Sequence, residues 1–231
     1  ERIIAGGADV IIAGGVESMT QVPMTGFKLS PHPGLVAEWP EVYMPMGITA
    51  ERVAAKYNVS REDQDAFAAE SQRRAVEAIG AGVFRDEIVA IETPNGVLED
   101  DELPRPGTTA EKLGRLKPAF QMGGSVTAGN SSPLTDGAAA VIVASRAKAE
   151  AEGWPILATF RGFAVAGVAP EIMGIGPVAA VPKLLARAGV ALEDVGHIEL
   201  NEAFAAQSLA VIRELGLDAA KVNPTGGAIA L

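Results

Sequence analysis

The chain contains no cysteine among its 231 residues. Without a thiol, these residues can form neither a disulfide nor a thiolate metal site, and they can supply no cysteine nucleophile. Histidine is almost as scarce, since His32 and His197 are the only two. Because they form no pair at helical spacing, the sequence predicts no metal site.

Basic residues and long apolar runs are also in short supply. The 19 Lys and Arg residues are outnumbered by 29 Asp and Glu residues, and the net charge of −10 excludes a surface that binds nucleic acid through clustered cations. The longest apolar runs, such as residues 10–13, fall far short of the roughly 20 residues that span a bilayer. No targeting sequence precedes them, so we predict a soluble, cytoplasmic protein without a membrane or nucleic-acid partner.

Aromatic residues make up only 5% of the chain, whereas apolar residues as a class reach 48%. This apolar content excludes disorder and predicts a core of small aliphatic side chains. Residues 8–13 form a β-branched run closed by Gly14 and Gly15, which is typical of a strand buried on both faces. Residues 137–144 form a second such run, and a charged helix follows it. The alternation predicts an α/β fold.

The remaining pattern predicts two outer α/β units that flank an insertion at about residues 20–125. The first strand lacks the neighbours that should precede it, and Leu231 follows an apolar stretch without a cap, so we expect a longer parent polypeptide. We predict a loop at 20–46, helices at 49–57, 60–80, 177–188 and 202–215, and strands at 84–92, 156–160 and 195–200, with Ser60 and Asp63 capping the second helix.

Residues 123–137, GGSVTAGNSSPLTDG, are almost all small or hydroxylated. Small residues let the backbone approach a ligand closely, and hydroxyl groups can hydrogen-bond a polar ligand without bulk. The segment therefore indicates a binding loop. The alternative is an ordinary Gly/Ser loop with no ligand.

Asn201 and Glu202 stand where a predicted strand ends and a predicted helix begins. Ligands usually bind at strand ends in open α/β sheets, and a fixed neutral amide there can orient a water or donate to an oxyanion. The alternative, which the local sequence favours, is that Asn201 is the N-cap of the following helix.

Two further segments carry weaker signals. Residues 222–231 contain a Gly-Gly pair that permits a tight turn. Four basic residues follow the acidic run 99–102, and they can either meet phosphate groups or form a solvated face. These residues are Arg105, Lys112, Arg115 and Lys117.

Taken together, these segments resemble the thiolase family. Its successive motifs match residues 13–19, 124–137, 170–177, 201–204 and 223–231, in that order. Residues 45–51 and 116–120 resemble the family as well, so the resemblance covers essentially the whole chain. It implies a layered αβαβα thiolase fold, here incomplete, with an inserted loop domain that covers coenzyme A. The implied boundaries are 1–20 for the end of the N-terminal half, 21–125 for the loop domain, 126–153 for the return to the N-terminal half, and 154–231 for the start of the C-terminal half.

The resemblance implies an acyltransferase that cleaves 3-ketoacyl-CoA by thiolysis or runs the reverse Claisen condensation. In this family a cysteine is acylated, a histidine activates it, and a second cysteine shuttles a proton. None of the three matches a residue of this chain, so they are expected outside it. Coenzyme A enters as a substrate, and no cofactor is expected to stay bound.

By motif match, Asn201 holds a water that helps to form an oxyanion hole, and Glu202 supports Asn201. Arg105 is expected near the adenine and phosphate end of coenzyme A, and Ser132 near its pantetheine. The residues expected to line the coenzyme A tunnel are Met46, Phe120, Ala128, Met173, Ala203 and Phe204.

One departure bears on the branch of the family. Many short-chain biosynthetic thiolases have histidine where this chain has Pro45, which favours the degradative, broader-chain branch and a homodimer, with a homotetramer as the alternative.

Two other interpretations stay open. One is a non-catalytic acyl-CoA or lipid-binding relative, although such relatives usually carry His-Asp-Cys-Phe at residues 201–204. The other is an inactive, truncated fragment.

Overall fold

The computed structural model describes residues 1–231, which form two compact units. The first unit, called unit 1, combines Glu1–Ser30 with Leu134–Gly162. The second, unit 2, combines Pro31–Pro133 with Phe163–Leu231. The boundaries at 20, 125 and 153 inferred from the family resemblance stay a prediction. None of the helices has both the length and the apolar character that a bilayer span requires.

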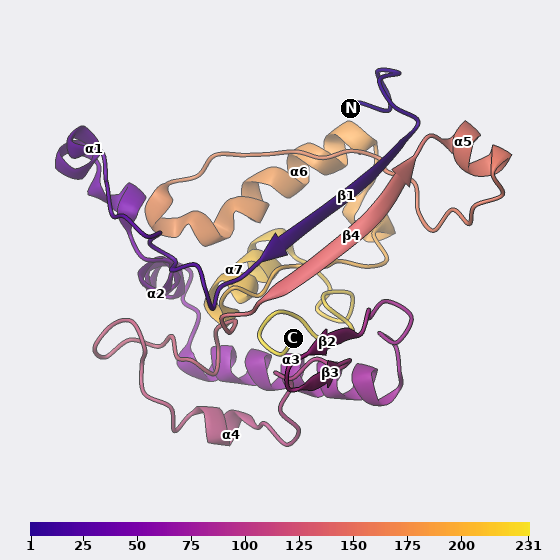
Figure 1. Ribbon diagram of the computed structural model, residues 1–231. Coiled ribbons are helices and arrows are strands. Elements are labelled where there is room, and N and C mark those ends of the chain that lie inside the picture. The colour runs from indigo at the N-terminus through magenta and orange to yellow at the C-terminus, as the bar shows by residue number, and fades with distance from the viewer. The chain divides into compact units, whose positions relative to one another are not determined.

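Unit 1 is built on a two-stranded antiparallel ribbon of β1, Val10–Glu17, and β4, Gly137–Ala144. The two strands lie side by side along their whole length, with Val10 opposite Ala144 and Glu17 opposite Gly137 (Figure 1). Helix α5, Arg146–Ala151, follows β4, and the Ser145 side chain caps it by accepting a hydrogen bond from the Lys148 amide. The strand and the charged helix expected here are confirmed.

The expectation for β1 was wrong in two respects. The strand does not close at Gly14 but runs through both glycines to Glu17, because Gly14 gives the backbone of β4 room: a Cβ atom there would lie 2.8 Å from the Ala139 carbonyl oxygen. Nor is the strand buried on both faces. The Ile12 and Val16 side chains are 75% and 82% exposed, since the ribbon has no second layer within these residues.

Unit 2 is mainly helical. Its long helix is α3, Arg61–Gly80, which begins as expected at the Ser60 cap, where the side-chain oxygen accepts a hydrogen bond of 3.0 Å from the Asp63 amide. The other elements are α1 Pro33–Glu38, the 3₁₀ helix η1 Pro40–Tyr43, α2 Met46–Lys56, β2 Ile91–Thr93, β3 Gly96–Leu98, α4 Ala110–Leu113, the 3₁₀ helix η2 Pro170–Ile175, α6 Gly176–Ala188, the 3₁₀ helix η3 Leu192–Asp194 and α7 Ala205–Leu215.

The core of unit 2 joins segments that are far apart in the sequence. One apolar cluster packs α2 and α7 against η2, and its members are small or medium-sized, as the low aromatic content predicts. They are Ala50, Val53, Ala54, Val59, Val126, Ile172, Ile175, Ala206 and Ala210. A second cluster brings Ala68 of α3 against Leu113, Ala205 and Ile229. These clusters fix α7 between α2 and α3.

The three predicted strands at 84–92, 156–160 and 195–200 do not form as expected. Of residues 84–92 only 91 and 92 lie in a strand, β2. Residues 84–87 form turns, in which the Gly82 carbonyl accepts from the Arg85 amide at 3.3 Å and the Phe84 carbonyl accepts from the Glu87 amide at 3.0 Å, and residues 88–90 lack regular structure. Residues 156–160 lack regular structure. Residues 195–200 contribute a single parallel bridge, between Ile198 and Val222.

The predicted loop at 20–46 holds α1 and η1, which both begin with proline at the first helical position. The His32 side chain accepts from the Leu35 amide and caps α1. Proline is compatible with this position because its missing N–H would have no partner in the helix. The pattern of many prolines and glycines therefore concealed two short helices.

Glu70 on α3 provides a test of surface electrostatics. Its hydrogen bonds with Arg73, and then with Arg74, hold its pKa at about 2, below the ordinary value of 4.5. A carboxyl with a lowered pKa stabilises the folded state above its unfolded pKa and loses this effect as the pH falls towards its folded pKa. We expect Glu70→Gln to lower stability at pH 7 and to matter progressively less below pH 4.5. Urea unfolding at pH 7 and pH 3 would measure this, and an equal loss at both values would contradict it.

Candidate active site

A groove of about 420 Å³ runs across unit 2 between α2, the start of α6, and α7. Five residues that the sequence singled out line it together: Met46, Met173, Asn201, Ala203 and Phe204. They come from three separate segments of the chain. Its wall is otherwise largely apolar, with Ala50 and Val53 of α2 buried at its base. A groove of this kind suits the aliphatic part of a ligand. Its polar lining side chains Thr49, Glu199 and Gln207 are hydrogen-bonded within the chain, so the Asn201 amide is the one left to meet the polar group of a ligand.

Asn201 is an exposed residue of this groove and not a helix cap. Helix α7 begins at Ala205, after Phe204, so the alternative role as N-cap is wrong. The Asn201 carbonyl oxygen accepts a hydrogen bond of 3.2 Å from Nε2 of Gln207. Its side-chain amide has no partner within the chain, and its N–H and C=O groups are therefore available to a ligand or a water in the groove.

Glu202, the next residue, is only 1% exposed. Its carboxylate accepts three hydrogen bonds, from Ser71 Oγ at 2.6 Å, from Asn223 Nδ2 at 2.9 Å, and from the Ile229 amide at 3.2 Å. A side chain at Gly227 would collide with this carboxylate, so the glycine is what lets the last segment of the chain close over it. Glu202 thus joins α3 to residues 223–229.

The turn that leads to Asn223 is held from the same helix. Arg74 of α3 donates from Nη1 to the Val222 carbonyl at 2.6 Å and to the Asn223 carbonyl at 3.2 Å. The guanidinium is itself oriented by Glu70, whose Oε1 accepts from Arg74 Nε at 2.7 Å. Asn223 has a left-handed backbone, with φ of 45°, which asparagine tolerates better than most residues.

Phe120 and Ser132 border the groove through contacts with its lining residues. The Phe120 ring meets Phe204 edge to face, with centroids 5.8 Å apart, and it covers Gly47 so closely that a side chain there would collide with the ring. The Ser132 amide donates to the Ala203 carbonyl at 3.0 Å. Ala128 is exposed in the turn just before Ser132, and it does not line this groove.

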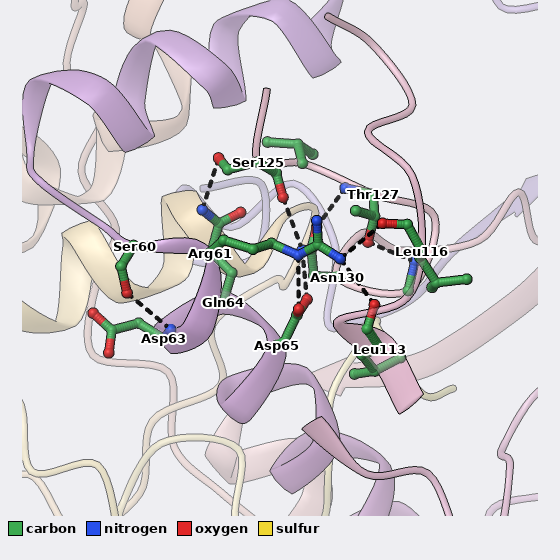
Figure 2. Close-up of polar contacts among 12 residues, drawn as sticks. Ser60, Arg61, Asp63, Gln64, Asp65, Leu113, Leu116, Ser125, Thr127 and Asn130 are labelled. Atoms are coloured by element: carbon green, nitrogen blue, oxygen red, sulfur yellow. Dashed lines mark hydrogen bonds and ion pairs between the residues drawn. The ribbon is translucent and has the colours of Figure 1, made fainter. Parts of the chain in front are cut away.

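A buried polar network fixes the segment that carries Ala128 and Ser132 (Figure 2). Asn130, fully buried, donates from Nδ2 to Asp65 Oδ1 at 2.9 Å and accepts at Oδ1 from the Thr127 amide at 2.8 Å. The other carboxylate oxygen of Asp65 pairs with Arg61 Nε at 2.7 Å. Arg61 in turn donates to the Leu113 carbonyl at 2.8 Å. Asn130 therefore ties the segment to Asp65 of α3, and Arg61 extends the same network from α3 to Leu113 of α4, as Figure 2 shows.

A second carboxylate holds the same segment from α2. Glu51 is 7% exposed, and its oxygens accept from the amides of Ser125 and Val126 at 2.9–3.0 Å. Gln64 of α3 adds a bond of 3.0 Å from Nε2 to Ser125 Oγ. Two helices thus hold the segment at Ser125, Val126 and Asn130, so its first half is bonded into unit 2.

Arg105 lies apart from the other predicted residues. Its backbone amide donates to Gln72 Oε1 at 2.7 Å, its side chain is exposed, and it does not line the groove. Of the basic residues that follow it, Lys112 binds the Gly107 carbonyl at 2.7 Å and Arg115 pairs with Glu111. Their bonds are local, as in a solvated face.

Sequence reasoning did not assign Ser71 and Asn223. Ser71 lies inside the predicted helix 60–80, and Asn223 lies in the segment 222–231, but no sequence pattern indicated a role of its own for either residue. Both are nearly fully buried and polar, at 3% and 2% exposed. A buried polar residue needs a partner, but the sequence cannot say that this partner is Glu202.

Two protein-family models match almost the whole chain. Residues 1–147 match the model described as "Thiolase, N-terminal domain", and residues 154–231 match "Thiolase, C-terminal domain". The chain is 53% identical to the 3-ketoacyl-CoA thiolase of Bacillus subtilis and 53% identical to the acetyl-CoA acetyltransferase of Pseudomonas aeruginosa. In both cases all of this chain is matched, but it spans only 62% and 63% of those relatives.

Solved structures similar to this chain are also thiolases. The dimeric peroxisomal thiolase of Saccharomyces cerevisiae superposes with a TM-score of 0.94 at 45% identity, over 100% of this chain and 60% of that one. The human mitochondrial 3-ketoacyl-CoA thiolase in complex with CoA gives a TM-score of 0.89 at 43% identity, over 100% and 61% of the two chains.

Proposed function

Because this chain belongs to the thiolase family, we propose that it forms the substrate groove and the oxyanion side of an acyltransferase. The α/β thiolase fold expected from the sequence is confirmed, as a part of that fold. The proposed reaction is the thiolytic cleavage of 3-ketoacyl-CoA, or the reverse Claisen condensation of acyl-CoA with acetyl-CoA. The observation that carries the proposal is the groove in which Met46, Met173, Asn201, Ala203 and Phe204 meet.

The proposed chemistry proceeds in two steps. A cysteine thiolate attacks the keto carbon of 3-ketoacyl-CoA, the bond between this carbon and C2 breaks, and the departing C2 takes a proton to give acetyl-CoA. The acyl group, now on the cysteine, then passes to the thiolate of a second coenzyme A. The nucleophile must come from outside residues 1–231, because these contain no cysteine.

Asn201 would act in the first step. As C2 departs, negative charge develops on the thioester oxygen of the acetyl-CoA enolate, and a fixed neutral donor stabilises it without a proton transfer. Asn201 fits this role because its amide is unpaired and faces the groove, while its backbone is held by Gln207. We propose that it acts through a bound water, together with a histidine from outside the chain.

Coenzyme A is proposed to enter as a substrate and not as a resident cofactor. The apolar wall of the groove would hold its pantetheine, with Phe120, Ala128 and Ser132 at the border and Arg105 near the phosphates. This is supported by the human mitochondrial relative, whose structure was solved with CoA. A homodimer is proposed by analogy with the dimeric yeast enzyme. The homotetramer and the cytoplasmic location stay predictions, and some relatives are described as peroxisomal.

The test is a thiolysis assay of the complete gene product, whose intact mass is measured first. With a 3-ketoacyl-CoA and free coenzyme A, we expect two acyl-CoA products by mass spectrometry, and an acyl group trapped on a cysteine of the protein. A complete gene product that binds coenzyme A but contains no cysteine and forms no products would contradict the proposal. That outcome would favour the non-catalytic acyl-CoA-binding function.

Arg105→Ala tests the proposed phosphate contact. A guanidinium that meets a phosphate forms a charge-assisted hydrogen bond, and its loss should raise the dissociation constant for coenzyme A by about tenfold. Isothermal titration calorimetry of the complete gene product measures this constant. Arg115→Ala is the matched control, because Arg115 is exposed and paired only with Glu111. An unchanged constant in Arg105→Ala would remove Arg105 from the site.

A further inference from the structure

One side chain clamps the residues on both sides of Asn201. Asn223 Oδ1 accepts from the Leu200 amide at 2.7 Å, and Asn223 Nδ2 donates to the Leu200 carbonyl at 2.8 Å. The same Nδ2 donates to Glu202 Oε1 at 2.9 Å. The asparagine amide therefore takes the place of a neighbouring strand for Leu200, and it also binds the carboxylate of the residue after Asn201.

Asn201 has little freedom under these bonds. Leu200 is fixed at both backbone groups, Glu202 is fixed by its buried carboxylate, and the Asn201 carbonyl is bound by Gln207 at 3.2 Å. Three consecutive residues are thus restrained, whereas the Asn201 side chain itself is unbound. The restrained backbone therefore fixes the direction in which the Cα–Cβ bond of Asn201 leaves the chain.

Asn223 is itself well anchored. It is 2% exposed, its carbonyl accepts from Arg74 Nη1 at 3.2 Å, and its amide donates to the Ile198 carbonyl at 2.9 Å. Its left-handed backbone, with φ of 45°, brings the side chain back towards Leu200. A buried amide whose donor and acceptor are both used in this way is specific to asparagine.

We propose that Asn223 is a positioning residue for Asn201: its amide clamps Leu200 and Glu202 and thereby aims the Asn201 side chain into the groove. Asn223 touches neither substrate nor the reacting atoms in this assignment. The predicted effect of Asn223 on the reaction rate rests on the proposed function, whereas its predicted effect on the backbone around Asn201 does not.

The structural part is tested by hydrogen exchange in Asn223→Gly. Glycine accepts the left-handed backbone without strain, so the variant removes the clamp and little else. We expect the Leu200 amide to exchange about tenfold faster or more, because its acceptor is lost, while the amides in the middle of α7 stay protected. Unchanged exchange at Leu200 would overturn the proposal.

The functional part is tested by steady-state kinetics of the same variant in the complete gene product. We expect kcat to fall by about 10-fold to 100-fold while KM for coenzyme A changes by less than about twofold, because a misdirected Asn201 affects the chemical step more than binding. An unchanged kcat, or an equal loss in binding, would overturn the positioning role.

The controls use a second left-handed asparagine. Asn58, with φ of 53°, is exposed and its side chain has no partner, so Asn58→Gly and Asn58→Asp should leave both readouts unchanged. If Asn223→Gly does not fold, Asn223→Asp replaces it in the kinetic test, since it keeps the shape and the acceptor for the Leu200 amide but turns the donor into an oxygen facing the Leu200 carbonyl and Glu202. Because Asp keeps that acceptor, a crystal structure of this variant then replaces hydrogen exchange, and an unmoved Asn201 would overturn the proposal. If the wild type shows no thiolysis, the proposed function fails, and a crystal structure of the variant decides the inference: a displaced Asn201 supports it, and an unmoved Asn201 overturns it.

Discussion

Replacing Asn201 with alanine in the complete gene product is expected to lower the rate of thiolysis by about 100-fold or more, which is the usual effect of removing one oxyanion donor. The physical reason is that this amide has no partner within the chain and lies in a largely apolar groove, so it is free to donate to an oxyanion or a bound water. Stability should hardly change, because the side chain is exposed and forms no hydrogen bond within the chain. Thermal unfolding and steady-state rates, measured on the same sample, separate the two effects.

Asn95→Ala is a suitable control for this experiment, because Asn95 is an exposed residue of the turn between β2 and β3. It should leave both rate and stability unchanged. A rate for Asn201→Ala within about twofold of wild type would mean that Asn201 takes no part in stabilising the oxyanion.

The second large effect is expected on stability. Glu202→Ala removes a buried acceptor, leaves the Ser71 hydroxyl and the Ile229 amide without their acceptor, and takes one of the two bonds of Asn223 Nδ2, which keeps its bond to the Leu200 carbonyl. Each stranded buried donor costs about 1–3 kcal/mol, so we expect the free energy of unfolding to fall by about 3–5 kcal/mol. Urea unfolding of the complete gene product measures this loss.

Two variants sharpen the second experiment. Glu202→Gln keeps the volume and one acceptor, so it should lose less stability than Glu202→Ala. Glu199→Ala, three residues earlier, removes an exposed carboxylate that pairs with His197, and should have little effect on stability. Equal stability of Glu202→Ala and wild type would show that the buried network does not hold residues 223–229 on α3.

The helices could be predicted from the sequence because their signals are local. Ser60 and Asp63 mark the start of α3 within four residues, and the apolar spacing behind them extends to Gly80. The strand β4 and the helix α5 were also read correctly from a continuous apolar run followed by charged residues. Such features need no knowledge of distant contacts.

At 84–92, 156–160 and 195–200 the local pattern predicted strands that the structure does not form as expected, and at 195–200 the reason is that distant contacts decide the structure. Leu200 looks like the end of a strand, yet its backbone groups are satisfied by the side chain of Asn223, 23 residues further on. The Glu202 carboxylate likewise finds a distant partner, because it accepts from the Ser71 hydroxyl, and these two residues are 131 residues apart in the sequence. A sequence pattern reports the need of a buried polar group for a partner, but not which partner it finds.

The lining of the groove could be predicted in part, whereas the roles of its residues stay predictions. The groove unites five of the residues that the family resemblance singled out, and the position of α7 excludes the capping role that the local sequence favoured for Asn201. Ala128 and Arg105 lie outside the groove lining, and their roles stay predictions. An exposed arginine on a loop has no local signal that distinguishes a phosphate ligand from a solvated charge.

The most direct test of the account is a crystal structure of the complete gene product with bound coenzyme A. We predict that the pantetheine chain lies in the groove between Met46 and Met173, with its thiol end next to Asn201 and its phosphates towards Arg105. Coenzyme A bound elsewhere on the molecule, with this groove empty, would contradict the account.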